Sequence, residues 1–300
     1  PIGRPIDVLK APYMLGSWTQ MEQVYPSRMI ARGGPVRALL PAAHALGDVR
    51  YEIDGETYDL DGYLERNAVM GLLVLKDGRI AYEAYRKGTG ETTRFVSWSV
   101  AKSMTSTLVG IALHDGASAW VVRRTMGRPL AQIVSERIWS KIGAEHDASW
   151  MLDRPGGMEI GGCCINATLR DYGRFGQLFL DEGRVGTEQV LPVEWIRTAT
   201  RPDPERPFLH PGRITGEGFA GSLGLGYQYN WWLWPEDGAY SAIGFGGQWI
   251  YVNPAARIVI VQTAIWTPGA AGKGYRETQA LFRAIVAALP DRRATHSRDP

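Results

Sequence analysis

The chain has 300 residues, 45% of them hydrophobic, which suffices for the core of one large domain. Its 33 basic and 31 acidic side chains nearly cancel, so no broad charge is present to attract nucleic acid or an anionic membrane surface. No apolar run approaches the roughly 20 residues that a bilayer-spanning helix needs, and no charged-then-apolar leader pattern opens the chain.

The first strongly patterned segments are a hairpin and a helix. Residues Met70–Tyr85 predict a β-hairpin, because an apolar run, the pair Asp77-Gly78 and a second strand-like run follow one another. From Ser99 to Leu113, apolar residues recur with a helical period. This pattern predicts a buried helix whose N-terminus faces a cleft.

Helices and then strands follow in the second half of the chain. Ala167–Asp181 predicts an amphipathic helix that ends at Gly183, and Pro192–Thr200 begins with proline, as helices often do. Aromatic and β-branched runs predict successive antiparallel strands at Tyr227–Trp234, Ala239–Ile243, Gln248–Asn253 and Ile258–Trp266, before a last helix at Tyr275–Leu289. Strands near both ends with helices between them predict an α+β fold, an antiparallel sheet flanked by helices.

Ser99 and Lys102 form a Ser-x-x-Lys motif at the start of the first predicted helix. On a helix, side chains at positions i and i+3 share one face, so the Lys102 amine can reach the Ser99 hydroxyl and accept its proton. This is the arrangement of an acylating serine hydrolase. A lysine acts as a base only when neutral, so we expect burial in the cleft to favour the neutral amine. The helix N-terminus would stabilise an oxyanion beside Ser99.

The competing interpretation is a solvated lysine on an ordinary helix. Against it, the chain has six lysines, and only Lys102 follows a serine at this spacing within an apolar helix. The other candidate sites are weaker. The five histidines show no metal-ligand spacing, no Gly-x-Ser-x-Gly motif is present, and the glycine-rich Gly216–Gly226 lacks the lysine of a phosphate-binding loop. Adjacent Cys163 and Cys164 favour two small, semi-buried thiol side chains over a disulfide, redox or metal role.

Several further motifs accompany Ser-x-x-Lys. They are Gly71–Arg79 before the nucleophile, Gly161-Gly162 and Asn166–Tyr172 after it, and Gly244–Trp249 near the end. With these motifs the chain resembles the serine β-lactamase and penicillin-binding family, in particular its esterase and 6-aminohexanoate-dimer hydrolase branch. The resemblance implies that Gly244–Trp249 lies on the edge strand beside the nucleophile. It also implies that the N–H groups of Ser99 and Phe245 form the oxyanion hole, with Gly246 in the same substrate-binding strand.

The chain departs from this family in two places. Glycines replace the basic residue of the family's Lys-Thr-Gly motif, which resembles the esterase-like branch and argues against efficient β-lactam hydrolysis. The helical lobe that usually carries a proton-relaying tyrosine is missing near residues 116–119, where His114-Asp115-Gly116 runs into a segment that resembles the helix after that tyrosine. Tyr227 and Tyr229 are better explained as packing residues.

We therefore expect an N-terminal extension at residues 1–68, a hydrolase domain at 69–290 and a tail at 291–300. The predicted function is a serine hydrolase that cleaves a small ester or linear amide through an acyl-enzyme on Ser99, without metal or organic cofactor. The alternatives are a catalytically impaired ligand-binding scaffold and a peptidoglycan-directed peptidase or β-lactamase. The expected compartment is the cytoplasm, or the periplasm if a leader precedes Pro1, and the sequence leaves the oligomeric state open.

Overall fold

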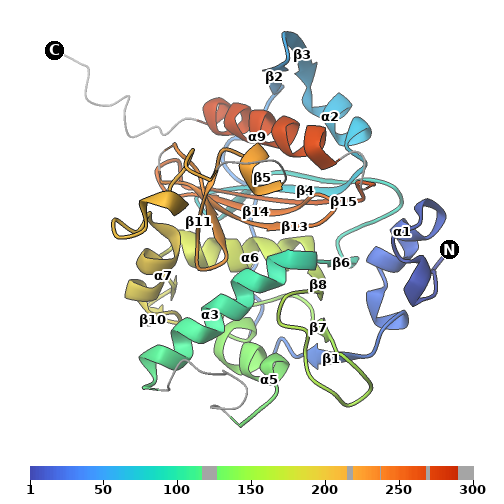
Figure 1. Cartoon of the computed structure of the whole chain (residues 1–300), viewed down its shortest axis with the longest axis vertical. Helices are drawn as coiled ribbons and strands as arrows, with labels where there is room; N and C mark the ends of the chain where they lie inside the picture. The colour runs from blue at the N-terminus through green and yellow to red at the C-terminus, as the bar shows by residue number, and fades with distance from the viewer. Residues whose placement is uncertain (117–126, 215–218, 237, 268–270, 290–300) are drawn as a thin grey trace.

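The computed structural model describes residues 1–116, 127–214, 219–236, 238–267 and 271–289, and its centre is a seven-stranded antiparallel sheet. Figure 1 shows this sheet between layers of helices, which confirms the predicted α+β fold. In spatial order its strands are β11 (Gly226–Gln228), β12 (Trp231–Leu233), β13 (Tyr240–Gly244), β14 (Gln248–Asn253), β15 (Ile258–Ala264), β4 (Val69–Lys76) and β5 (Arg79–Tyr85).

The predicted hairpin is present as β4 and β5. Asp77 and Gly78 close it with positive φ angles of 51° and 73°. Two successive residues with positive φ form a two-residue turn whose twist matches that of the flanking strands. The Asp-Gly pair therefore predicted the hairpin correctly. In the sheet β4 pairs with β15, so segments near both ends of the chain meet at the centre of the fold.

One strand prediction was wrong. Tyr227–Trp234 is two short strands, β11 and β12, rather than one. The chain reverses at Tyr229 and Asn230, whose φ angles are 40° and 68°. Asparagine tolerates this left-handed conformation but a bulky tyrosine rarely adopts it, so the turn was hidden in an aromatic run.

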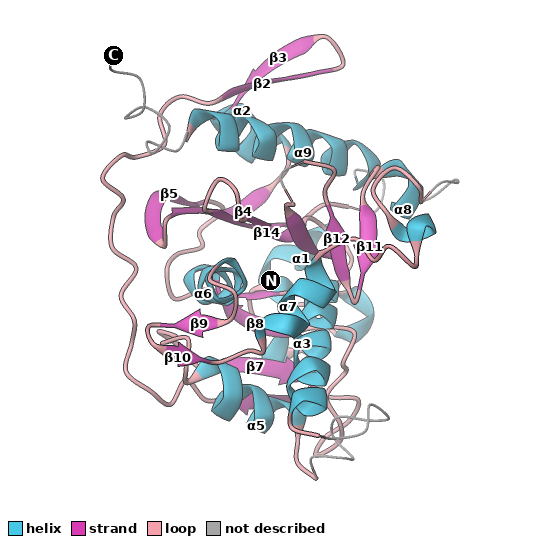
Figure 2. Ribbon diagram, turned by 90° about the vertical axis from the view of Figure 1, so that its left-hand side faces the viewer, coloured by secondary structure: helices cyan, strands magenta, loops and turns pink. Residues whose placement is uncertain are grey.

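Helices cover both faces of the sheet (Figure 2). Helix α9 (Ala271–Ala288) packs on one face, and α6 (Leu169–Leu180) and α3 (Ala101–His114) lie on the other. Alternate residues of each central strand point into the two cores, as a pleated strand requires. In β15, for example, Ile258 and Ile260 join the α9 side while Val259 and Val261 join the α6 side.

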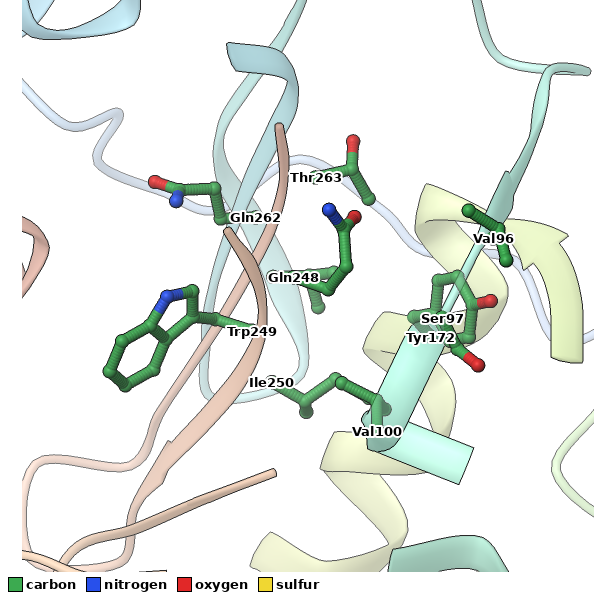
Figure 3. A pocket seen from close by; sticks show the side chains of 10 residues that line it. Val96, Ser97, Val100, Tyr172, Gln248, Trp249, Ile250, Gln262 and Thr263 are labelled. Carbon is green, nitrogen blue, oxygen red and sulfur yellow. The ribbon is translucent and has the colours of Figure 1, made fainter. Parts of the chain in front are cut away.

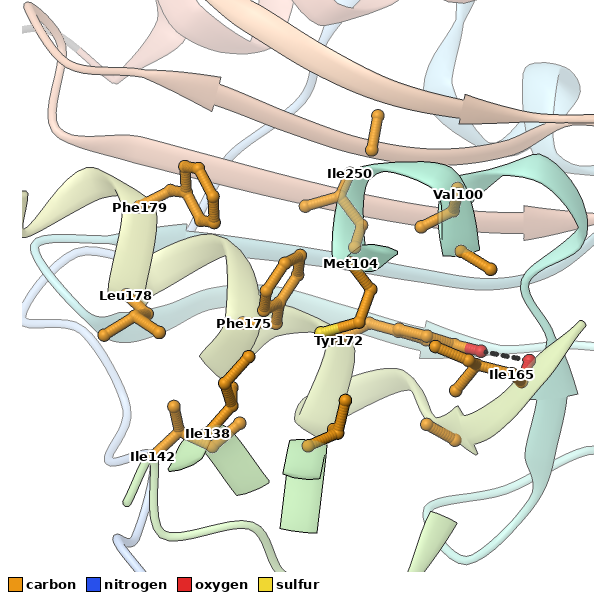
Figure 4. Close-up of a cluster of buried hydrophobic side chains, with 14 of the residues drawn as sticks. Val100, Met104, Ile138, Ile142, Ile165, Tyr172, Phe175, Leu178, Phe179 and Ile250 are labelled. Carbon is orange, nitrogen blue, oxygen red and sulfur yellow. Dashed lines mark hydrogen bonds between the residues drawn. The ribbon is translucent and has the colours of Figure 1, made fainter. Parts of the chain in front are cut away.

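The core on the α6 side lies directly beneath the start of α3. Figure 4 shows Phe175 and Phe179 of α6 in one cluster with Val100 and Met104 of the α3 segment. Tyr172 crosses this cluster and donates hydrogen bonds to the carbonyls of Phe95 and Ile165, at 2.7 and 2.9 Å. The start of α3 therefore packs against buried side chains of α6.

A second sheet and several short elements complete the fold. The second sheet has the order β1 (Ser27–Ile30), β7 (Ala148–Met151), β8 (Ile165–Thr168) and β6 (Arg94–Val96). The small hairpins are β2 (Arg50–Ile53) with β3 (Glu56–Asp59), and β9 (Arg184–Val185) with β10 (Glu188–Gln189). The remaining α-helices are α1 (Ala11–Trp18), α2 (Leu60–Arg66), α5 (Leu130–Val134), α7 (Val193–Thr200) and α8 (Phe219–Ser222). The single-turn helices are η1 (Pro5–Asp7), η2 (Met21–Gln23), η3 (Trp98–Val100), η4 (Ser135–Trp139) and η5 (Pro207–Leu209).

The N-terminal 68 residues are built into the fold rather than standing apart. Strand β1 is an edge of the second sheet, and the β2–β3 hairpin packs against α9. The division of the chain at residue 68 stays a prediction. The segment near 116–119, where the helical lobe was expected, and the tail 291–300 lie outside the described residues except for Gly116. Within the described ranges, no helix is long and apolar enough to cross a membrane.

Candidate active site

Ser99 and Lys102 meet as the motif predicts. Ser99 lies in the single turn η3, which continues directly into α3, so the two side chains emerge from successive turns of one helical segment. Lys102 Nζ and Ser99 Oγ are hydrogen-bonded at 2.6 Å. At this separation a proton can pass between the two atoms in one step, which is the geometric requirement for a nucleophile and its base.

The expected burial of Lys102 is wrong for the described part of the chain. Lys102 is exposed, whereas Ser99 is half-buried. The reason is the position of the residue on α3: the helix buries Ala101 and Ser103 on either side, so Lys102 is on the outward face.

The backbone just before Ser99 is strained. Trp98 has a φ angle of 45°, which is unusual for a bulky side chain and costs of the order of 1–3 kcal/mol. Its indole packs edge-on against Trp18 of α1 and Phe245, with ring centroids 5.1 and 5.6 Å away. These three rings, Trp18, Trp98 and Phe245, are called the aromatic cluster below. It joins the N-terminal segment, the nucleophile turn and the end of β13.

The end of β13 touches the nucleophile turn through Gly244. A Cβ atom on Gly244 would lie 2.3 Å from the carbonyl oxygen of Ser97 and 3.2 Å from the backbone nitrogen of Ser99. Only a glycine allows the strand to approach this closely. The peptide that follows, which carries the Phe245 N–H, therefore lies near the nucleophile.

The prediction that this segment forms the edge strand was wrong, because β12 and β11 lie beyond β13 in the sheet. However, β12 pairs only with Tyr240 and Ser241 at the start of β13. The other end of β13, at Gly244, is thus not covered by β12 and meets η3 instead. At this end the turn η3 takes the place of a neighbouring strand, so the backbone of Ser99 lies directly beside that of Gly244.

Phe245 and Gly246 lie in the turn from β13 to β14. Gly246 and Gly247 have φ angles of 73° and 91°, so the turn depends on residues that tolerate left-handed backbone. A Cβ on Gly246 would lie 2.4 Å from the indole of Trp18. The turn is therefore packed against the N-terminal segment on one side and close to Ser99 on the other.

A loop at 161–164 borders Lys102. Thr105 of α3 donates a hydrogen bond of 2.6 Å to the Gly161 carbonyl, and a Cβ on Gly162 would be 3.7 Å from Lys102 Cε. The backbone N–H of Cys164 donates to the Trp98 carbonyl at 3.2 Å. The structure pairs Cys163 and Cys164 as a disulfide, contrary to the expectation of two thiols.

Three tyrosines near this region are used for structure. Burial raises the pKa of the Tyr172 hydroxyl far above its ordinary value, so Tyr172 stays a neutral donor to backbone carbonyls. Tyr227 donates to the Asn230 side chain at 2.7 Å, and the Tyr229 ring packs 5.2 Å from that of Trp195. The contacts of Tyr227 and Tyr229 fit the packing roles expected for them. No proton-relaying tyrosine is assigned by these contacts.

Some residues of this region were missed from the sequence. Trp18 is far from Phe245 along the chain, yet its ring packs against that of Phe245. Gln248, the first residue of β14, donates a hydrogen bond to the Phe245 carbonyl. Gln248 carried one signal, a polar residue at the start of a strand that is otherwise apolar or aromatic up to Asn253. No group of three or more His, Cys, Asp or Glu that could hold a metal ion occurs among the residues with described positions.

Comparison with known proteins identifies the family. A family model described as Beta-lactamase matches residues 113–284, more than half of the chain. The chain therefore belongs to the β-lactamase family, a family of hydrolases, and the predicted resemblance is confirmed. The matched span begins after Ser99 and Lys102, so it does not test their roles.

Individual relatives agree with this assignment. A 6-aminohexanoate-dimer hydrolase of Paenarthrobacter ureafaciens is 30% identical over 151 residues, which cover 49% of this chain and 36% of that protein. The chain thus matches only about a third of that relative's length. A solved structure from Bacillus anthracis, provisionally named a 6-aminohexanoate-dimer hydrolase, has a TM-score of 0.80 at 20% identity and covers 95% of this chain and 97% of its own. A penicillin-binding protein homologue from Caulobacter crescentus has a TM-score of 0.56 at 11% identity over 76% of this chain and 95% of its own. At these identities the two solved structures establish the fold alone.

Proposed function

We propose that this chain is a serine hydrolase that cleaves a small ester or linear amide through an acyl-enzyme on Ser99. The observation that supports this most directly is the 2.6 Å contact between Ser99 Oγ and Lys102 Nζ at the start of a helix. The close approach of β13 at Gly244 brings backbone of this strand next to the Ser99 backbone nitrogen. A nucleophile, a base and nearby backbone N–H groups are the parts that acyl transfer requires.

The proposed reaction has two halves. In the first, neutral Lys102 takes the Ser99 hydroxyl proton while Ser99 Oγ bonds to the substrate carbonyl carbon. The carbonyl oxygen becomes an oxyanion, and the N–H groups of Ser99 and Phe245 donate hydrogen bonds to it. Collapse of this intermediate breaks the ester or amide bond, and the departing alcohol or amine takes the proton from Lys102.

In the second half, water replaces the leaving group. Lys102 accepts a proton from the water molecule as its oxygen attacks the acyl carbon, and the bond to Ser99 Oγ breaks. Lys102 passes the proton taken from water to Ser99 Oγ, and the carboxylic acid product leaves with both partners restored. The name of the Paenarthrobacter ureafaciens relative describes hydrolysis of a linear amide dimer, which makes short linear amides the first natural class to test beside activated esters.

The decisive experiment is the intact mass of the protein before and after brief exposure to p-nitrophenyl acetate. An increase by one acetyl group in the wild-type protein, absent in Ser99→Ala, supports the proposal. Turnover of the ester by Ser99→Ala at the wild-type rate would refute it. Ser103→Ala is the matched control, because Ser103 is a serine on the same helix whose hydroxyl donates 2.7 Å to the Asn230 carbonyl instead of contacting Lys102.

The second candidate is a scaffold that binds an acyl ligand without releasing it. The exposed position of Lys102 favours this function, because water competes with Ser99 for hydrogen bonds to an exposed amine. In the same experiment, a stable acetyl adduct without continued p-nitrophenol release would identify it. Reaction with benzylpenicillin instead of the ester would favour a β-lactamase or peptidase, against which the glycines at 246 and 247 argue.

A further inference from the structure

The turn that carries the proposed oxyanion-hole residue Phe245 is rich in glycine. Three of the four residues from Gly244 to Gly247 are glycine, and such a backbone is free to rotate its peptide planes. A rotated plane would replace an N–H donor by a carbonyl oxygen, which repels an oxyanion. Something must therefore hold these planes if the turn is to act in catalysis.

Gln248 holds the two peptide planes that follow Phe245, the second of them together with the Trp266 backbone N–H, which donates 3.1 Å to the Gly246 carbonyl. Gln248 is only 2% exposed, at the first position of β14. Its side-chain Nε2 donates toward three carbonyl oxygens: Phe245 at 3.3 Å, Gly246 at 3.1 Å and Ala264 of β15 at 2.6 Å. The first two belong to the turn and the third to a central strand, so the amide ties the turn to the rigid part of the sheet.

The neighbouring peptides are fixed in the same way. Tyr275 of α9 donates to the Gly244 carbonyl at 3.4 Å, and Gln262 donates to the Gly247 carbonyl at 3.2 Å. In a trans peptide the C=O and the following N–H point in opposite directions. The Phe245 N–H, which follows the Gly244 carbonyl, is therefore directed away from Tyr275.

The orientation of the Gln248 amide follows from its surroundings. Turning it over would place its oxygen against three carbonyl oxygens, so Nε2 must face them. Among the described residues, Gln248 Oε1 and the Thr263 hydroxyl have no hydrogen-bond partner, and both side chains line a small cavity of about 10 Å³. Figure 3 shows both side chains in this cavity's wall, between the sheet and the segment at Val96–Val100.

We infer that Gln248 is a positioning residue for the oxyanion hole: its buried amide locks the carbonyls of Phe245 and Gly246 away from the reacting atoms. The inference rests on the proposed function of Ser99. It adds a residue that never touches the substrate.

The test compares Gln248→Met with Gln279→Met. Methionine fills similar space but donates no hydrogen bond. Gln279 is a matched control, because it is 5% exposed and donates 3.2 Å to a backbone carbonyl, that of Leu223 in another loop. We expect Gln248→Met to slow acylation of Ser99 by p-nitrophenyl acetate about 10- to 100-fold with little change in KM, since misplaced donors weaken only the transition state. Gln279→Met should stay within about 3-fold of wild type, the range expected away from the reacting groups.

Two further readouts separate positioning from a general loss of structure. Binding of phenylboronic acid, which forms a tetrahedral adduct with the serine, should weaken in parallel with acylation in Gln248→Met only. Hydrogen–deuterium exchange should become faster at Phe245–Gln248 in that variant and not in Gln279→Met. The exchange experiment needs no catalysis and also serves if acylation is too slow to follow.

The outcomes distinguish the two proposals. If wild-type protein is acylated at Ser99 and Gln248→Met reacts as fast as Gln279→Met, the positioning role is overturned while the hydrolase proposal stands. If the wild-type protein is never acylated, the proposed function fails, and the role of Gln248 in an oxyanion hole fails with it. Faster exchange of the turn would then show only that Gln248 holds the backbone.

Discussion

Gly244→Ala tests the contact on which the proposed site depends. The new methyl carbon would lie 2.3 Å from the Ser97 carbonyl oxygen, so β13 and the turn η3 must separate by about 0.7 Å (3.0 − 2.3) to remove the clash and by about 1.1 Å (3.4 − 2.3) to reach an ordinary contact. A displacement of about 1 Å at reacting groups can lower a rate about 100-fold, or about 2.7 kcal/mol in activation free energy. Overpacking should also lower the free energy of unfolding by about 1–3 kcal/mol.

Stopped-flow release of p-nitrophenolate measures the acylation rate, and thermal unfolding measures stability. Gly176→Ala is the control, because its methyl group would lie 2.6 Å from a Val259 side-chain carbon in the core between α6 and β15. We expect both variants to lose stability but only Gly244→Ala to lose acylation. Equal acylation rates in the two variants would show that β13 does not position the oxyanion hole.

Three other changes test separate parts of the molecule. Lys102→Met should slow acylation about 100- to 10,000-fold without changing the affinity for a non-reactive ester analogue. A burst of p-nitrophenolate release close to that of wild type would contradict the role of Lys102 as base. Gly246→Ala, which places a methyl group 2.4 Å from Trp18, should destabilise the fold. Combining it with Trp18→Ala should cost less than the sum of the two single changes in urea unfolding, and strict additivity would contradict the packing. Burial acts to raise the pKa of Glu277, but hydrogen bonds from Tyr51, Asn67 and Arg66 outweigh it and lower that pKa. The ionised carboxylate therefore adds stability above the ordinary glutamate pKa, which is lost as pH falls through the lowered value. Glu277→Gln should reduce the free energy of unfolding by about 1–3 kcal/mol at pH 7, with the difference shrinking in acid, and a pH-independent difference would exclude this assignment.

The sequence patterns correctly predicted structural features that are formed by residues close together in the chain. The Asp77-Gly78 hairpin and the α6 helix were recognised because their signals, a turn pair and a helical period, are complete within a few residues. The contact between Ser99 and Lys102 belongs to the same class, since the geometry of one helical turn is enough to produce it.

Contacts across the chain were not predictable in this way. Nothing near Trp18 in the sequence indicates that its ring packs beside Phe245, more than two hundred residues away. The exposure of Lys102 depends on which elements lie over α3, and that is decided by tertiary packing. The turn at Tyr229 was missed because tertiary packing imposed a backbone conformation that its residue type disfavours.

The family match and the proposed chemistry lie on different parts of the chain, and this limits what the match can say about function. The matched span 113–284 supplies β13, the turn and Gln248, while Ser99, Lys102 and Trp18 precede it. The two parts are in contact at two places. The backbone of Ser97–Ser99 packs directly against Gly244, and the aromatic cluster brings Trp18 and Trp98 against Phe245. The proposed catalysis therefore depends on the fit between the two parts, so a substitution at this junction should lower activity more than an equally destabilising one within either part.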